Sequence, residues 1–336
     1  MTLALTAIDP ALPTARGPIS AAVLDALRQP PGDTAIAVPV ADADPWGQDL
    51  QLALYVLYEL HYRGFAGVDA DHEWNPELLR LRRQLEAPFE AAVRAEVGDI
   101  GADERVDAEM DGLCVEPADG NGPSYYLRDR GTWDQLAEYF VHRSVYHLKE
   151  ADPHAWAIPR LVGHAKAAFV AIEFDEFGGG RGDHVHQQLY SDLLEAAGLN
   201  SAYLAYLDAV PAESLAVVNL MSLFGLHRRL RGATVGHFAA VEITSSPGSR
   251  RLVEAMERLD APEACKAFYA EHVVADAVHE QVVRTDVVGD LIAREPQLER
   301  DVIFGIRACD AVENRLAAHL LDAWTAGRSS LRRPLT

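Results

Sequence analysis

The stretch FYAEHVVADAVHEQVV, residues 268–283, contains the pattern HxxxDxxH, formed by His272, Asp276 and His279. At about 100° per residue on an α-helix, offsets of four and seven residues place all three side chains on a face roughly 60° wide. The residues between them are mostly valine and alanine, which leaves little of this helix free to face water. A buried polar stripe needs partners, so the pattern predicts a metal site, with a solvent-facing polar stripe as the alternative.

A second stretch, FDEFGGGRGDHVHQQLY at residues 174–190, has three consecutive glycines between Glu176 and His186. On a straight helix these two residues would lie about 15 Å apart and could not share a metal. Each glycine costs about 1 kcal/mol relative to alanine inside a helix and readily adopts positive φ. The stretch is therefore either an ordinary glycine-rich helix end or a break that brings a carboxylate and an imidazole together. His184, two residues before His186, should point elsewhere.

Two more carboxylates are candidates, although neither stands out locally. Glu242 is embedded in HFAAVEITSS, and a glutamate is rarely buried without a partner; the alternative is a helix-end glutamate that reaches solvent. Glu150 ends an apolar-faced helical stretch, where glutamates are usually solvated, and His147 is a rival ligand on a similar face. Glu59 and His61 are discounted as a metal pair because two residues on a helix diverge by about 160°.

Composition and charge limit the class of protein. The chain has 336 residues, 49% hydrophobic, and a formal net charge of −21, which argues against nucleic acid or an anionic membrane as the main partner. Its cysteines form no CxxC pair, so neither a disulfide framework nor a zinc knuckle is indicated. The first 17 residues have no basic region before their apolar residues, and no apolar run approaches about 18 residues. These features predict a cytoplasmic protein.

Helical patterns dominate the chain. Alternating apolar and polar runs are scarce and no βαβ unit is evident, so we expect an all-α helical bundle. Residues 1–45, rich in Ala, Pro and Asp, are expected to form an N-terminal extension, residues 46–130 to carry helices that pack on the bundle, and residues 131–330 to form the main domain. Within the main domain, ATVGHFAAVEITSS and PGSRRLVEAMERL are expected as successive segments, and the last helix from about Glu295 to Gly327.

Taken together, these segments resemble the haem-oxygenase-like di-iron oxidases and oxygenases, often described as iron-containing redox enzymes. The resemblance covers roughly residues 130–320 and implies a haem-oxygenase-like seven-helix bundle, with an additional helical N-terminal region. Glu176 resembles the extra carboxylate of the nitrogen-oxygenating branch. The positions that match, and that would hold two irons, are Glu150, Glu176, His186, Glu242, His272, Asp276 and His279.

The donor set agrees with this resemblance. Imidazole and carboxylate suit iron or manganese, and the absence of cysteine ligands argues against structural zinc. Four carboxylates make a pair of Fe(II) ions about neutral, so the site can be buried without a large uncompensated charge. Ferritin-like bundles reach the same charge with four carboxylates and two histidines, whereas the third histidine here indicates a different arrangement.

As a hypothesis, the resemblance implies that two irons, cycling between Fe²⁺ and Fe³⁺, react with O₂ through a peroxo-diferric intermediate. Oxygen would then pass to the nitrogen of a small amine, amino acid or other nitrogen-containing substrate. Glu150 and His186 would mainly serve one iron, Glu242 would bridge the pair, and Glu176 would swing on and off its iron. Manganese in place of iron, an external electron donor and a homodimer are all compatible with this hypothesis.

Three alternatives stay open. A di-iron oxidase could instead carry out aliphatic C–H or C–C chemistry on an amino or fatty acid. A haem-degrading enzyme of the same fold would need a proximal histidine and a haem-sized apolar slot, and would have no use for so many acidic residues. A non-catalytic helical metal-binding or interaction protein would show no substrate-dependent O₂ consumption.

Overall fold

The computed structural model describes residues 9–33, 35–38, 40, 42–116 and 120–335, and none of them forms a β-strand. The prediction of an all-α chain is confirmed. The first eight residues of the expected N-terminal extension lie outside the described residues. No helix within the described ranges combines the length and the apolar character needed to cross a membrane.

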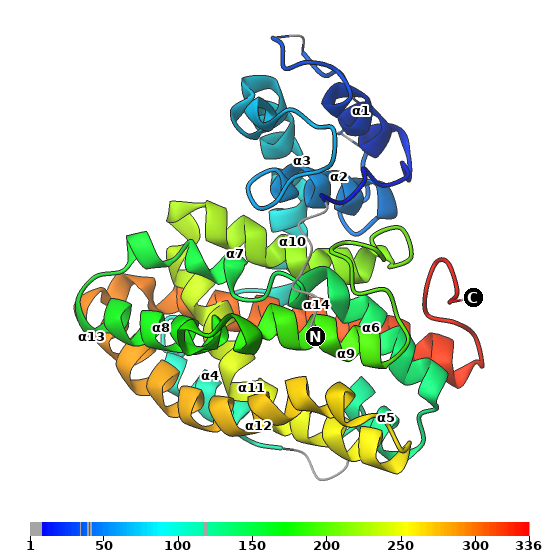
Figure 1. The fold of residues 1–336 in the computed structure, drawn as a ribbon. Coiled ribbons are helices and arrows are strands. Elements are labelled where there is room, and N and C mark those ends of the chain that lie inside the picture. Colours follow the sequence, from blue (N-terminus) through cyan, green and yellow to red (C-terminus); the bar gives the residue numbers. More distant parts are fainter. Residues whose placement is uncertain (1–8, 34, 39, 41, 117–119, 336) are drawn as a thin grey trace.

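The N-terminal helices divide into two groups. The first three stand together above the bundle in Figure 1, and α2 packs on α10. The next two lie against α11 and α14. Their bounds are α1 (Pro18–Leu27), α2 (Gln48–Glu59), α3 (Pro76–Val97), α4 (Val106–Leu113) and α5 (Pro123–Asp129), with a 3₁₀ turn η1 (Ala70–Trp74) before α3.

The main bundle follows. In the described part of the chain from residue 131 onward, seven α-helices have eleven residues or more, in agreement with the expected seven-helix bundle. These are α6 (Trp133–His147), α8 (Gly163–Glu176), α9 (His186–Ala196), α10 (Ala212–Leu226), α11 (Arg231–Arg258), α12 (Glu263–Val282) and α14 (Glu299–Thr325). The shorter elements are α7 (Asp152–Ala155), α13 (Asp290–Arg294), a π-helix η6 (Val283–Gly289), and the 3₁₀ turns η2 (Ile158–Arg160), η3 (Gly178–Gly180), η4 (Gly182–His184), η5 (Arg228–Leu230) and η7 (Pro296–Leu298).

Helix α11 is longer than expected. The two segments predicted around Pro247 form one continuous helix, Arg231–Arg258, so the expected division is wrong. Proline lacks the N–H group for a helical hydrogen bond and usually breaks a helix, but packing against α5, α12 and α14 supports both halves. As a result Glu242 lies in the interior of a helix and not at its end. The last helix starts later than expected, at Glu299, because Pro296 opens a 3₁₀ turn.

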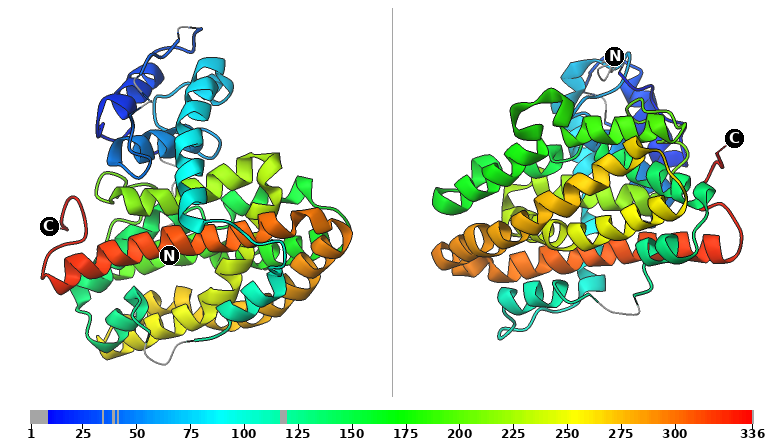
Figure 2. Two further views of the ribbon diagram at one scale, coloured as in Figure 1. Left: turned by 180° about the vertical axis from the view of Figure 1, so that it is seen from behind. Right: turned by 60° about the horizontal axis from the view of Figure 1, so that its bottom comes forward.

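Helices α11 and α14 touch through their backbones, and Figure 2 shows α14 running along the whole bundle. A Cβ atom added to Gly236 would lie 2.0 Å from the carbonyl oxygen of Val302, and one added to Gly305 would lie 2.1 Å from that of Ala233. Both obstacles are backbone atoms, which cannot rotate away. This close approach fixes the position of α11 along α14, and with it the position of Glu242 in the interior of the bundle.

Substituting Gly236 by alanine is expected to lower the free energy of unfolding by about 2 kcal/mol or more, because overpacking typically costs 1–3 kcal/mol. Urea denaturation measures the change. Gly248→Ala is the matched control, because a Cβ there meets only the end of Arg251, at 4.0 Å. The control should stabilise the helix by about 0.5–1 kcal/mol. Equal effects of the two variants would contradict this account.

Helix α12 continues without interruption into the π-helix η6 and then into α13. Gly289, at the second junction, keeps helical angles of φ −58° and ψ −49°. The buried side chains of η6, Val283, Val287 and Val288, belong to the core shared with α8 and α11. Such i→i+5 segments are rare and frequently lie near functional sites. Here the segment begins four residues after the HxxxDxxH pattern ends.

Candidate metal centre

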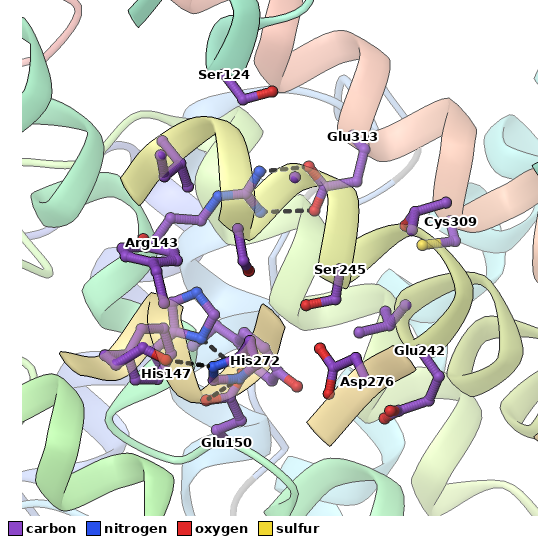
Figure 3. A pocket seen from close by; sticks show the side chains of 18 of the residues that line it. Ser124, Arg143, His147, Glu150, Glu242, Ser245, His272, Asp276, Cys309 and Glu313 are labelled. Carbon is purple, nitrogen blue, oxygen red and sulfur yellow. Dashed lines mark hydrogen bonds and ion pairs between the residues drawn. The ribbon is translucent and has the colours of Figure 1, made fainter. Parts of the chain in front are cut away.

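The structure brings all seven candidate ligands together. Each is buried, with at most 6% of its surface exposed. Donor atoms of Glu150, Glu176, His186 and His272 lie within 4.8 Å of one another, and so do those of Glu176, Glu242, Asp276 and His279. Glu176 is the member common to both groups. The two groups are therefore adjacent and could hold a pair of metal ions. Figure 3 shows Glu150, His272, Asp276 and Glu242 along one side of a cavity.

The glycine run explains how Glu176 and His186 meet. Helix α8 ends at Glu176 and α9 begins at His186, with two 3₁₀ turns between them. Gly178 has φ +74°, and a Cβ there would lie 2.6 Å from the backbone of His184 and Val185, so only glycine fits. The chain reverses its direction at this turn, and His186 Nδ1 therefore lies 2.7 Å from Glu176 Oε2. His184 instead points toward Asp183 at the surface, with its side chain 40% exposed.

Several donor atoms are buried without a hydrogen bond, which is the test of whether these residues fit metal ions. Glu150 Oε2, His186 Nδ1 and Asp276 Oδ1 are all of this kind. His186 Nδ1 is close to a carboxylate oxygen of Glu176, but the two atoms lack hydrogen-bond geometry. Two metal-ligating atoms that point at the same metal position would show this arrangement. Buried polar atoms normally have partners. Oxygen and nitrogen donors without a thiolate suit iron or manganese, so the residues fit such a pair.

His272 has its tautomer fixed by the helix that carries it. Its Nδ1–H donates to the carbonyl oxygen of Phe268 at 2.7 Å, because a carbonyl can only accept. The other nitrogen, Nε2, lies 3.8 Å from Glu150 Oε2. A ring nitrogen held by a backbone carbonyl leaves the second nitrogen oriented for a metal.

Three carboxyl groups of the cluster, those of Glu150, Glu176 and Glu242, hold protons more tightly than usual. Burial, reinforced by neighbouring carboxylates, raises the pKa of Glu150 to about 8, of Glu242 to about 8 and of Glu176 to about 7. Burial alone would lower the pKa of His279, but the nearby carboxyl group of Asp276 and the hydrogen bond with Glu242 outweigh it and raise that pKa to about 11. The cluster therefore carries more negative groups than it can ionise without a cation.

The metal-free protein is expected to lose stability as pH rises from about 5 to about 8. The carboxyl pKa values in the folded state lie above the ordinary value of 4.5, so the native state binds more protons than the unfolded state. The stabilisation is complete below pH 4.5 and is lost as pH passes 7 to 8. Urea denaturation of chelator-treated protein across this range measures the trend. A stability that rises from pH 6 to 8 would contradict it.

His147, the rival ligand, belongs to neither group. Its Nδ1 lies 2.7 Å from Glu150 Oε1, and burial lowers its pKa well below the ordinary value, so the ring is neutral. A neutral ring with one N–H can donate that proton to Glu150. His147 therefore holds one oxygen of Glu150 and leaves the other, Oε2, directed at the cluster.

Glu59 and His61 also lie outside both groups, as the sequence analysis expected. Glu59 is fully buried and pairs with Lys149 at 2.8 Å, while Tyr203 donates to its other oxygen at 2.7 Å. Lys149 is itself buried and immediately precedes Glu150. Glu150 lies on the turn that follows α6. The ion pair therefore fastens this turn to helix α2 of the N-terminal group.

Glu173 is a further buried acid that the sequence analysis missed. It is 2% exposed and both of its side-chain oxygens lack a hydrogen-bond partner. Burial raises its pKa to about 9, with contributions from Glu176 and Glu242. Its position three residues before Glu176, on the same helix face, was the available signal.

The cluster opens on a cavity of about 380 Å³. At its other end Arg143 donates two hydrogen bonds to Glu313, at 2.7 and 2.6 Å (Figure 3). Ser245 lies between this ion pair and the cluster. A volume of this size holds a small molecule, with one end at the candidate metal centre.

Fold and site together define a helical protein with a buried carboxylate–histidine centre beside a small-molecule cavity. Residues 137–314 match the family of iron-containing redox enzymes. This match covers more than half of the chain, so the chain belongs to that family of oxidoreductases. The resemblance to iron-containing redox enzymes that was stated from the sequence is therefore confirmed for the family.

Two known proteins are similar to parts of this chain. The nitrosourea synthase of Streptomyces achromogenes subsp. streptozoticus is 24% identical over 145 residues, which is 43% of this chain and 31% of that protein. The chain thus spans less than a third of this relative's length. A CADD-like protein of unknown function from Nostoc punctiforme has a known structure that aligns with a TM-score of 0.45 and 18% identity, over 66% of this chain and 93% of that one.

Proposed function

We propose that this chain is a non-haem di-iron oxygenase that uses O₂ to oxygenate the nitrogen of a small amine, amino acid or other nitrogen-containing substrate. The observation that carries the proposal is the pair of buried four-residue groups with Glu176 in common. Bound iron would supply the activation of O₂ at this place. Manganese would suit the same donors.

The proposed ligand roles follow from the grouping. Glu150, His186 and His272 would hold one iron, and Glu242, Asp276 and His279 would hold the other. Glu176 would bridge, because among the described residues it is the member that the two groups share. This assignment replaces the sequence-based expectation that Glu242 bridges.

The surrounding residues would orient these ligands. His147 holds Glu150, the carbonyl of Phe268 holds His272, and Asp175 Oδ2 lies 3.2 Å from His279 Nε2. Such supporting contacts fix ring orientation and ligand basicity. Every proposed ligand is buried, which limits the contact of the centre with bulk water.

Two observations support a nitrogen-containing substrate. Glu176 resembles, by its place in the sequence, the extra carboxylate of the nitrogen-oxygenating branch, and the similar protein from Streptomyces bears the name nitrosourea synthase. The haem-degrading alternative is disfavoured because carboxylates line the cavity at the candidate centre, including Glu150, Glu176 and Glu242. Aliphatic oxidation is distinguished by the substrate panel below.

The test begins with anaerobic Fe(II) loading and metal analysis, for which we expect two irons per chain. O₂ is then mixed in with a panel of amines, amino acids and carboxylic acids while its consumption and the products are followed. His186→Ala should lose iron, whereas His184→Ala, two residues away at the surface, should retain it. Only trace iron in the unmodified chain would refute the proposal. Turnover of carboxylic acids alone would favour the aliphatic oxidase.

A further inference from the structure

Glu173 has a property that no other described residue shares, since both of its side-chain oxygens are buried and neither has a hydrogen-bond partner. Glu173 is also one of the residues that line the cavity in which a small molecule would bind. Leaving a carboxyl buried without partners costs free energy. A ligand that enters the cavity can supply the missing partner.

No described side chain of the cavity wall supplies a cation to Glu173. The arginines there are Arg143 and Arg251. Arg143 is occupied by Glu313, and Arg251 donates to Glu116 and Ser124. Three histidines also line the wall. Burial lowers the pKa of His147 and of His154 well below the ordinary value, so these rings are neutral, and His272 directs Nε2 at Glu150.

The charge balance leaves room for one positive charge. This step rests on the proposed function. Four carboxylates, those of Glu150, Glu176, Glu242 and Asp276, balance two Fe(II) ions. Glu173 is uncharged while it lacks a partner, because its pKa is raised to about 9. Once ionised it would be a fifth carboxylate, and a monocationic group beside it would neutralise that charge, as buried charges require.

We propose that Glu173 binds a cationic nitrogen group of the substrate, so that the substrate class is an amine or a guanidine and not an anionic carboxylic acid. Glu173 lies one turn before Glu176, a rise of about 4.5 Å along the helix axis. A group bound there is held next to the bridging position. Glu173 is thus a residue that determines specificity.

Isothermal titration calorimetry under anaerobic conditions, with Fe(II)-loaded protein, tests this inference. The probes are n-butylammonium, n-butylguanidinium and, as an anionic counterpart of similar size, pentanoate. Glu173→Gln keeps the shape of the side chain and removes its charge. We expect it to weaken binding of the two cations by about tenfold or more, since hydrogen bonds to charged groups are among the stronger ones. Binding of pentanoate should not weaken, and iron should stay at two per chain.

Asp310→Asn is the matched control, because Asp310 is another carboxyl of the same cavity wall, on helix α14. It should leave cation binding unchanged. The inference is overturned if Glu173→Gln binds the cations as tightly as the unmodified chain, if that chain binds pentanoate as tightly as the cations, or if it binds neither cation. Loss of iron in Glu173→Gln would also overturn it, since Glu173 would then be a metal ligand. Trace iron in the unmodified chain is a separate result that refutes the proposed function and, with it, this inference.

Discussion

Glu176→Ala is expected to remove both irons, whereas Glu242→Ala should leave about one iron per chain. The reason is geometric. Glu176 has donor atoms within 4.8 Å of both groups, while Glu242 belongs to one. On the proposed assignment, each group would fall to three candidate ligands without Glu176, and the proposed bridge would be lost. Substrate-dependent O₂ consumption should fall roughly a hundredfold or more, since even supporting contacts of metal ligands are worth 10–100-fold.

Metal analysis after anaerobic loading distinguishes the two variants, and O₂ consumption follows the functional loss. Asp183→Ala is a suitable control, because this carboxylate lies on the same connecting segment but has 81% of its side chain exposed. It should retain both irons. If Glu242→Ala loses both irons and Glu176→Ala loses one, then Glu242 is the bridge and the assignment made here is wrong.

Lys149→Met is expected to lower the free energy of unfolding by about 3–5 kcal/mol, the usual cost of leaving a buried charge without its partner. The uncompensated group would be Glu59, which is 0% exposed. The ammonium of Lys149 also lies 4.4 Å from the ring centre of Tyr55 and 4.6 Å from that of Tyr62. Urea denaturation of the metal-free protein separates this effect from any change in metal binding.

Two comparisons make the Lys149 result specific. Lys149→Met combined with Glu59→Gln should recover part of the loss, because no buried charge is then left alone. Arg80→Met, which breaks a surface ion pair with Glu77 at 2.7 Å, should cost less than about 1 kcal/mol. If Lys149→Met costs no more than Arg80→Met, the buried pair does not anchor the turn before Glu150.

The parts of the site that sequence could predict are those set by local geometry. The HxxxDxxH spacing fixes one helix face, and three glycines mark a break wherever they occur. Glu242 was harder to place, because its surroundings depend on whether the helix ends near Pro247. The helix continues past Pro247 only because helices distant in the sequence pack against it, and the local helix propensity does not depend on those contacts.

Other features depended on contacts between remote residues. Glu59 and Lys149 are 90 residues apart, so neither predicts the other. The bridging role passed from Glu242 to Glu176 in our assignment because it depends on positions across helices, which spacing along the chain does not give. Glu173 was overlooked because two acids one helical turn apart, here Glu173 and Glu176, usually indicate a helix face that is exposed to solvent.

The π-helix that follows α12 has a consequence for how the chain can change in length. Each i→i+5 turn accommodates one residue more than an α-turn, and one residue corresponds to about 100° of rotation. Removing a single residue between Val283 and Gly289 would let this segment return to an ordinary α-helix. The helix could then present either His272, Asp276 and His279 to the interior or its downstream valines to α8, but not both. The extra residue thus sets the rotation of α12, which carries the candidate ligands, independently of the rotation of the valine-rich segment that packs on α8. A substitution in one of these two parts therefore need not rotate the other part about the helix axis.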